Sequence, residues 1–254
     1  MKQGTKTALA YIFFAASAII APAQASEDIP KDTITQNMAR IPAGEFTMGA
    51  DSLGRDHGAP AHKVYLNEFL IDKHEVTNKQ FEEKFPDHIR HKLSAGDDNP
   101  VTRVSWFDAI DYCTAVGKSL PTEAQWEKAA RGTTKSANDF PWGKEFNAAS
   151  VHGGLKLRDG TAPVGSYPAN EYGLYDMGGN VWEWTNDWAD YYPNTDKTIK
   201  NPTGPARGHH KIRRGGAWSD EIKGMKTGWR DWSSPDSSFY ADVGFRCAYN
   251  PPQP

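Results

Sequence analysis

The amino-acid sequence predicts a mixed α+β domain with little regular secondary structure. Nine tryptophans and 23 glycines occur in a 254-residue chain that is 38% hydrophobic. This composition favours an aromatic core and tight turns over long helices and wide sheets. Regular hydrophobic periodicity also disappears after Asp139, where Pro, Gly, Asn and Trp recur at short intervals. Once a targeting segment is set aside, a chain of this length is expected to build one hydrophobic core.

The N-terminus has the three parts of a secretory signal peptide. Lys2 and Lys6 form a positive region, residues 8–21 are almost wholly apolar, and Ser26 is preceded by the small-x-small cleavage site Ala-Gln-Ala. The apolar run is shorter than the roughly 20 residues of a membrane-spanning helix, so we expect cleavage and not a membrane anchor. We therefore predict a signal peptide over residues 1–25 and a periplasmic location.

The charge of the mature chain argues against a nucleic-acid partner. The whole chain has a formal charge of -3, and removal of the two lysines of the signal peptide changes it to -5. The chain also has no basic run long enough to follow a phosphate backbone. We expect a protein that binds no nucleic acid.

The only two cysteines are Cys113 and Cys247. In an oxidising compartment, two cysteines that lie far apart in sequence can form one structural disulfide, and two free buried thiols are the alternative. Ala109, Ile110 and Cys113 share one face of a predicted helix, which places Cys113 inside the protein.

Short elements are predicted in order along the chain. Alternation and Gly punctuation predict a strand and turn at 41–49 and a second strand at 63–71. Three helix starts are marked by a capping Ser or Thr with an acid or amide three residues later. The three helices follow Thr77 and stop before Pro86, follow Ser105 and stop at Gly117, and follow Thr122 and stop near Arg131.

Residues 173–185 read Gly-Leu-Tyr-Asp-Met-Gly-Gly-Asn-Val-Trp-Glu-Trp-Thr, a segment of unusual composition. It resembles the signature of the formylglycine-generating enzyme, or sulfatase-modifying factor, family. Seven further blocks of the family pattern occur in the family's order, so the resemblance covers roughly residues 38–249. These blocks lie at 41–49, 71–78, 104–106, 120–127, 141–143, 214–218 and 244–247.

The resemblance implies an α+β, formylglycine-generating-enzyme-like fold, which is a complex C-type-lectin-like fold. By architecture and compartment, the branch that fits best is the periplasmic one of the pyoverdine-maturation protein, which acts in oxidation of a siderophore precursor without copper cysteines. No residue of this chain shows a siderophore substrate. The predicted boundaries are a signal peptide at 1–25, a linker at 26–37, a sulfatase-modifying-factor-like domain at 38–250 and a tail at 251–254.

The resemblance also implies a structural calcium ion. The matching positions are Asp176, Gly179, Val181 and Glu183. Two carboxylates and main-chain carbonyls are the hard oxygen ligands that calcium prefers. In the alternative, Asp176 and Glu183 cap turns or pair with arginine.

In the family, the positions of Cys113 and Cys247 match a structural disulfide, so both cysteines of this chain are used. The formylglycine-generating oxidases bind copper(I) with two further cysteines after the Gly-Gly segment, because copper(I) prefers soft thiolates. Here the first position falls on or near Asp220 and the second near Met225. We therefore expect a member without the copper-thiolate site and without copper, and the sequence identifies no other redox cofactor.

Under an enzyme hypothesis, the pocket beside the Gly-Gly segment is retained with new side chains. Asp220 or Glu221 would act as acid or base, and Arg230 would clamp an anion. Trp182 and Trp218 would bind the substrate. A carboxylate beside a tryptophan wall has a raised pKa because of desolvation, which suits proton abstraction from a phenol or an amine.

The substrate would be a small exported metabolite or a protein side chain, modified by a divergent oxidoreductase or tailoring factor. The alternative for the two acidic side chains is a solvated loop.

A binding hypothesis uses the same scaffold without catalysis. Exposed aromatic surfaces suit sugars, aromatic molecules or peptides, whereas tryptophans that fill the core bind nothing. Convergence of the three charged candidates on one concavity favours the enzyme, and an aromatic cleft without them favours a ligand- or partner-binding module. The cleft would be lined by Trp182, Trp218, Trp229 and Trp232.

Overall fold

A computed structural model describes residues 31–133, 139–155 and 159–252. The predicted signal peptide, the first part of the predicted linker and the last two residues of the predicted tail lie outside these ranges. Among the described residues, no helix has the length and apolar character needed to cross a membrane.

Three small sheets organise the described part of the chain. The first contains β1 (Met38–Ile41), β4 (Phe69–Asp72) and β10 (Ala248–Tyr249). The second contains β2 (Gly44–Met48), β3 (His62–Leu66) and β6 (Ile199–Lys200). The third has the order β8 (Arg230–Ser233), β7 (Lys211–Arg214), β5 (Trp182–Trp188) and β9 (Val243–Gly244), so β8 is an edge strand.

The helices are short. They are α1 (Lys31–Thr35), α2 (Asn78–Glu82), α3 (Trp106–Ala115) and α4 (Glu123–Arg131), with 3-10 turns η1 (Arg55–His57), η2 (Ala148–Ser150) and η3 (Ile222–Met225). The three predicted helix starts are confirmed, because α2, α3 and α4 each begin with both hydrogen bonds of a capping box.

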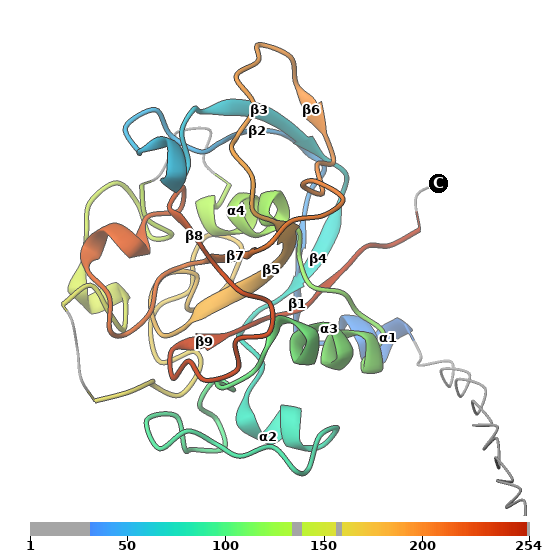
Figure 1. Cartoon of the computed structure of the whole chain (residues 1–254), viewed down its shortest axis with the longest axis vertical. Coiled ribbons are helices and arrows are strands. Elements are labelled where there is room, and N and C mark those ends of the chain that lie inside the picture. The colour runs from blue at the N-terminus through green and yellow to red at the C-terminus, as the bar shows by residue number, and fades with distance from the viewer. Residues whose placement is uncertain (1–30, 134–138, 156–158, 253–254) are drawn as a thin grey trace, which may run out of the picture.

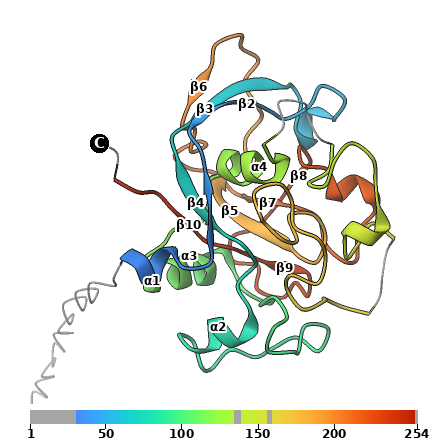
Figure 2. The same cartoon turned by 180° about the vertical axis from the view of Figure 1, so that it is seen from behind.

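Helix α4 lies between β2–β3 on one side and β5–β7 on the other (Figures 1 and 2). Its Trp126 is fully buried, as is Trp184 of β5. Helix α3 lies on the other side of β5 from α4, near β9 in Figure 1 and near β10 in Figure 2. The predicted fold class is confirmed: a mixed α+β domain with an aromatic core and little regular structure.

The predicted strand at 63–71 is two strands in two different sheets. Val64 and Leu66 are buried in β3, and Phe69 and Ile71 are buried in β4. The interval of three residues between Leu66 and Phe69 breaks the period of two and marks the corner. The expectation of a single strand was therefore wrong.

The second half of the chain contains the widest sheet, which the loss of periodicity did not predict. Strand β5 has neighbours on both edges, and Trp182 to Thr185 are all buried. A strand covered on both faces shows no alternation of apolar and polar residues. This is why the sequence pattern failed to indicate β5.

Candidate functional site

The loop after β7 fixes the position of Asp220. Gly215 and Gly216 have φ angles of +97° and +73°. A Cβ atom on Gly216 would lie 2.8 Å from the backbone of Gly224, so the loop folds closely on itself. The Asp220 Oδ2 atom accepts a 2.9 Å hydrogen bond from the Ala217 amide, and the Asp220 amide donates a 3.0 Å bond to the Ala217 carbonyl.

Asp220 lines a cavity of about 340 Å³, which we call the Asp220 cavity. Two other predicted residues, Trp182 and Glu221, line the same cavity. The remaining wall comes from three separate segments, namely η1, the loop with η3, and β8 with the residue before it. Its residues are His57, Ser219, Lys223, Gly224, Trp229 and Asp231.

The carboxyl group of Asp220 has a raised pKa, mainly because it is desolvated by burial. The nearby carboxylate of Asp242 acts in the same direction. Hydrogen bonds from the Ala217 amide and from the Trp182 indole oppose the shift but do not cancel it. Asp220 beside Trp182 is therefore the acid next to a tryptophan wall that the sequence predicted.

Glu221 lies at the mouth of this cavity, with 49% of its side chain exposed. It forms a 3.5 Å ion pair with Lys223, whose ammonium group also lies 5.7 Å from the centre of the Trp229 ring. The solvated surroundings make Glu221 a weaker acid–base candidate than Asp220, because solvent screens its charge.

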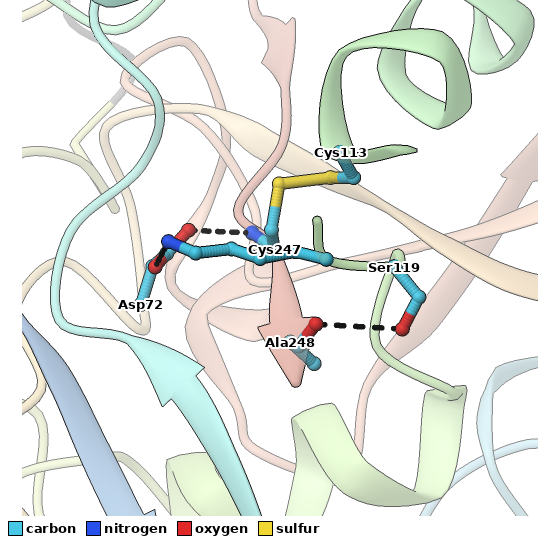
Figure 3. Close-up of a disulfide and its surroundings, with 6 residues drawn as sticks. Asp72, Cys113, Ser119, Cys247 and Ala248 are labelled. Atoms are coloured by element: carbon cyan, nitrogen blue, oxygen red, sulfur yellow. Dashed lines mark hydrogen bonds and ion pairs between the residues drawn. A yellow bond between two sulfur atoms is a disulfide. The ribbon is translucent and has the colours of Figure 1, made fainter. Parts of the chain in front are cut away.

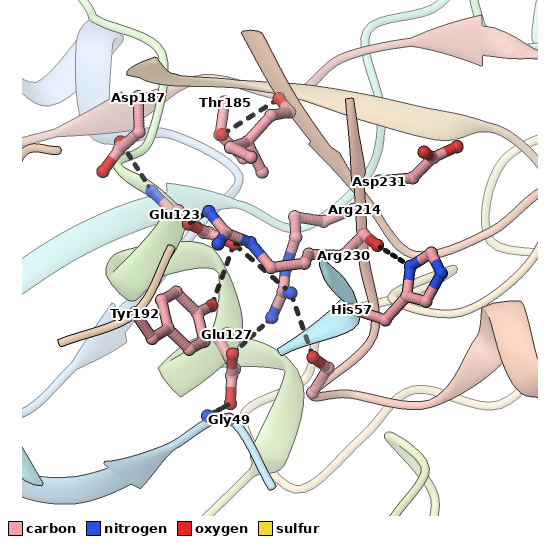
Figure 4. A network of polar contacts seen from close by, with 12 residues as sticks. Gly49, His57, Glu123, Glu127, Thr185, Asp187, Tyr192, Arg214, Arg230 and Asp231 are labelled. Atoms are coloured by element: carbon pink, nitrogen blue, oxygen red, sulfur yellow. Dashed lines mark hydrogen bonds and ion pairs between the residues drawn. The ribbon is translucent and has the colours of Figure 1, made fainter. Parts of the chain in front are cut away.

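Arg230 does not converge with the two acids, which corrects its predicted role as an anion clamp. Its guanidinium is buried and donates 2.8 Å and 2.7 Å hydrogen bonds to the two carboxylate oxygens of Glu123. A third donor, Nη1, bonds the Asp190 carbonyl at 2.5 Å. Figure 4 shows this guanidinium inside a network with Glu123 and Glu127, while Asp231 points away from it.

The two predicted substrate-binding tryptophans occupy different surroundings. Trp182 is 4% exposed but forms part of the cavity wall. Trp218 is 7% exposed, packs in the same hydrophobic core cluster as Trp182 without lining the Asp220 cavity, and has an indole nitrogen without a hydrogen-bond partner. The position of Trp218 favours the core interpretation over the cleft.

His57 is a cavity residue that the sequence reasoning missed. Its ring stacks on Trp229, with centroids 4.1 Å apart, and lies 6.2 Å from the ring centre of Trp232. The Nδ1 atom lies 3.2 Å from the Arg230 carbonyl, which orients the ring. His57 lies 163 residues before Asp220 in no family block, so only the fold brings the two together.

A disulfide joins Cys113 of α3 to Cys247, the residue before β10, as the resemblance implied (Figure 3). The sulfur atoms are 2.05 Å apart, and both residues are fully buried. The Cys247 amide also donates a 3.1 Å hydrogen bond to Asp72. The alternative of two free thiols does not apply.

Neither of the two positions that carry copper-binding cysteines in the oxidases has a thiol here. Asp220 occupies the first. Met225 stands near the second, fully buried in a small cluster with Phe140 and Val151. A thioether packed among apolar side chains and a carboxylate do not replace a pair of thiolates.

The predicted calcium residue Glu183 is engaged in an ion pair. Both of its oxygens accept 2.7 Å hydrogen bonds from Arg246, and Oε2 also accepts a 2.8 Å bond from the Trp126 indole. Glu183 and Arg246 are both fully buried. In this arrangement the Glu183 carboxylate does not fit calcium, which needs oxygen atoms free of cationic partners.

Asp176, by contrast, lies beside a second carboxylate, which can supply the oxygen ligands that calcium needs. Buried Glu75 lies next to it, and the Glu75 Oε2 atom has no hydrogen-bond partner. Burial raises the pKa of both acids, and the negative charge of Asp176 raises that of Glu75 further. Two adjacent buried acids with one unpartnered oxygen fit a cation.

No group of three or more His, Cys, Asp or Glu side chains among the described residues is placed to hold a metal ion. Gly179 and Val181, the other predicted ligands, both lie in the loop before β5, close to Asp176 in sequence. Calcium binding stays a prediction.

Comparison with known proteins places the fold and the site in context. The family described as "Sulfatase-modifying factor enzyme 1-like domain" matches residues 24–251. Formylglycine-generating enzyme of Mus musculus is 33% identical over 287 residues, covering 86% of this chain and 76% of that protein.

Two solved structures share the architecture. Treponema denticola variable protein 1 superposes with a TM-score of 0.76 at 25% identity, covering 84% of this chain and 95% of the other. PvdO from Pseudomonas aeruginosa superposes with a TM-score of 0.65 at 25% identity, covering 84% and 93%.

Proposed function

Because the chain belongs to the sulfatase-modifying factor family, we propose that it is a divergent tailoring factor or oxidoreductase that modifies an exported metabolite or a protein side chain. The proposed location is the periplasm, as the N-terminal sequence predicts. The proposal rests on one observation above all: Asp220, a partly buried acid with a raised pKa, lines a cavity beside Trp182.

The chemistry proposed for Asp220 is proton transfer. In its ionised form, the carboxylate accepts a proton from an O–H or N–H group of the substrate, and the resulting carboxyl group returns it to the product. Desolvation makes the carboxylate a stronger base than an exposed aspartate. The Ala217 amide and the Trp182 indole hold the acid in place during the transfer.

His57 is the second polar group of the proposed site. If Nδ1 carries the proton and donates to the Arg230 carbonyl, Nε2 is left as a hydrogen-bond acceptor toward a ligand. The stacked Trp229 ring limits rotation of the imidazole. We propose that His57 orients the substrate group whose proton Asp220 accepts.

The proposed reaction is distinct from copper-thiolate formation of formylglycine. Both cysteines of the chain are joined in the Cys113–Cys247 disulfide, so neither is available beside Asp220. We expect a cysteine-containing sulfatase peptide to remain unmodified by this protein, even when copper(I) and oxygen are supplied.

A comparison of variants tests the proposal while the substrate is still unidentified. Purified wild type, Asp220→Asn and Asp236→Asn are each incubated with periplasmic extract from cells that lack the protein. Asp236 is an exposed residue outside the Asp220 cavity and serves as the matched control. Mass spectrometry then compares the metabolites and the protein side chains.

We expect a species whose mass changes with wild type and Asp236→Asn but not with Asp220→Asn. Thermal melts confirm that all three proteins are folded. If the same products form with Asp220→Asn, or if no species changes in any sample, the proposed chemistry is wrong.

The second candidate function is a non-catalytic ligand- or partner-binding module. The stacked rings of His57 and Trp229, with Trp232 adjacent, favour it because they form an aromatic surface that needs no chemistry to bind a ligand. A ligand recovered intact from both wild type and Asp220→Asn would support this alternative.

We further propose that a structural calcium ion is held by Asp176 and Glu75. Glu183, one of the residues matching the family site, would remain the ion-pair partner of Arg246. The ion would compensate two buried negative charges and stabilise the loop before β5.

A further inference from the structure

A second cavity, of about 220 Å³, lies on the other side of the edge strand β8. Trp229, just before β8, and Asp231 in β8 line the Asp220 cavity, whereas Arg230 and Trp232 of β8 line the second. His57 lies against the edge of this strand and stacks with a tryptophan from each cavity. The two cavities are therefore neighbours across the His57 ring.

The second cavity has two aromatic walls, Tyr191 and Trp232. The guanidinium of Arg55 lies 4.3 Å from the centre of the Tyr191 ring, so this region already holds one cation on an aromatic face. Among the residues that the structure describes, no lysine or arginine head group lies over the Trp232 ring. Because the His57 ring stacks toward Trp232, a cation from outside would approach the part of the Trp232 ring that lines the cavity.

Two carboxylates, Asp56 and Asp190, complete the wall. Asp190 accepts a 2.8 Å hydrogen bond from the Tyr191 amide. Within the described ranges, neither carboxylate forms an ion pair. Both residues are exposed at the cavity mouth, so their negative charge faces an incoming ligand.

The arginine in this cavity does not neutralise those carboxylates. Arg230 forms its ion pair with the buried Glu123 carboxylate, with donor–acceptor distances of 2.8 Å and 2.7 Å, and its Nη1 atom bonds the main-chain carbonyl of Asp190. His210, the remaining ionisable residue of the wall, is exposed. The cavity thus combines aromatic faces with two carboxylates that form no ion pair within the described ranges.

We propose that the second cavity binds an organic ammonium group. A cation over an indole or phenol face is attracted by the negative face of the ring, and nearby carboxylates add Coulomb attraction. The cavity is large enough for a head group of the size of choline. Resting on the proposed function, the inference is that the substrate carries an ammonium group here and places its reacting group beside Asp220.

The test compares a cation with a neutral molecule of the same shape. Wild type at pH 8 and low salt is titrated calorimetrically with choline, with butylammonium and with 3,3-dimethylbutanol, the uncharged isostere of choline. We expect at least one ammonium ion to bind and 3,3-dimethylbutanol to bind about tenfold more weakly. Preference between choline and butylammonium identifies a methylated or a primary ammonium group.

Three variants locate the binding. Asp56→Asn and Trp232→Leu should each weaken ammonium binding severalfold, whereas Asp236→Asn should leave it unchanged. Asp56 is exposed on η1, so its substitution keeps the test valid even if Trp232→Leu unfolds the protein. Equal affinity for the neutral isostere, no ammonium binding, or unchanged binding by Asp56→Asn would overturn the inference.

The two proposals fail separately. Ammonium binding that survives in Asp220→Asn, together with the absence of any product in extracts, would remove the proposed chemistry and leave the ammonium site. Asp220-dependent product formation from a substrate without an ammonium group would do the opposite.

Discussion

Strand β8 separates two clusters of ionisable side chains that differ in how completely their charges are paired. On one side lies a buried ion-pair network in which every charged group contacts a partner (Figure 4). On the other side, the Asp220 carboxyl accepts neutral donors and has no arginine or lysine in an ion pair with it among the described residues. The network consists of Glu123, Glu127, Arg131, Arg214 and Arg230.

The comparison shows that the ion pairing of a charged side chain, and not its residue type, distinguishes a structural residue from a candidate catalytic one. Arg230 and Asp220 lie ten residues apart and were both predicted to be functional. Arg230 directs three of its five N–H donors at Glu123 and the Asp190 carbonyl, and its charge is paired with the Glu123 carboxylate. Asp220 keeps a raised pKa because its desolvation outweighs the charge of Arg213, which forms its own ion pair with Asp231.

The largest expected effect comes from breaking the buried network. Glu127→Gln leaves Arg131 and Arg214 without their shared carboxylate, which should lower the free energy of unfolding by about 3–5 kcal/mol. Urea unfolding measures the change. The matched control is Glu68→Gln, which removes the exposed ion pair with Arg40 and should cost less than about 1 kcal/mol. Similar small losses in both variants would contradict the scaffold role.

The disulfide should contribute almost as much. Its two cysteines are 134 residues apart, so it restricts a large loop of the unfolded chain. Replacing both with serine should lower the free energy of unfolding by about 2–5 kcal/mol. Reduced wild type is the control, and it should unfold at nearly the same urea concentration as the double variant. A double variant as stable as oxidised wild type would exclude this contribution.

Asp187 predicts a pH dependence of stability. Burial raises its pKa to about 7. A raised acid pKa means that the folded state binds the proton more tightly, so stability is greatest below the unfolded pKa of about 3.9 and is lost as pH rises through about 7. Between pH 5 and pH 8 the loss should be about 2–3 kcal/mol.

Asp187→Asn removes this effect while an amide oxygen replaces the carboxylate that accepts the Glu123 amide. Its free energy of unfolding should therefore exceed that of wild type more at pH 8 than at pH 5. Urea unfolding at both pH values checks this, and an equal difference at the two pH values would refute the assignment.

Removal of calcium is expected to have a smaller effect. With calcium at about ten to thirty times its Kd, binding adds about 1–2 kcal/mol, which a chelator should abolish. Glu75→Gln and Asp176→Asn should lose most of the calcium-dependent shift in Tm. If the Tm of wild type is the same with calcium and with a chelator, the Glu75–Asp176 pair binds no calcium.

Local signals in the sequence were enough to predict the helices. The capping boxes at Thr77, Ser105 and Thr122 involve residues within one turn, so no distant contact was needed to form them. The strands were harder because pairing and burial come from the rest of the fold. Strand β5 has no alternation to detect, since it is buried on both faces.

The candidate site was predictable only in part. The Gly-Gly segment identified Asp220 and Trp182, whose neighbourhood is set by a short loop and a family block. The roles of Arg230 and Trp218 depend on whether each side chain faces the Asp220 cavity or the interior of the protein. The spacing of residues in the sequence does not reveal this. His57 lies at the cavity because its ring packs on Trp229 in the folded protein, and no sequence motif predicts this position.

The measurement that tests the central claim most directly is the titration of Asp220 by NMR. Carbon-13 labelled aspartate gives carboxyl resonances, and the one missing from Asp220→Asn identifies Asp220. We predict that its pKa lies above the ordinary aspartate value of about 3.9, because the cavity desolvates the carboxylate. A pKa at or below that value would show a solvated or cation-paired group, and would contradict the assignment of Asp220 as the acid–base centre.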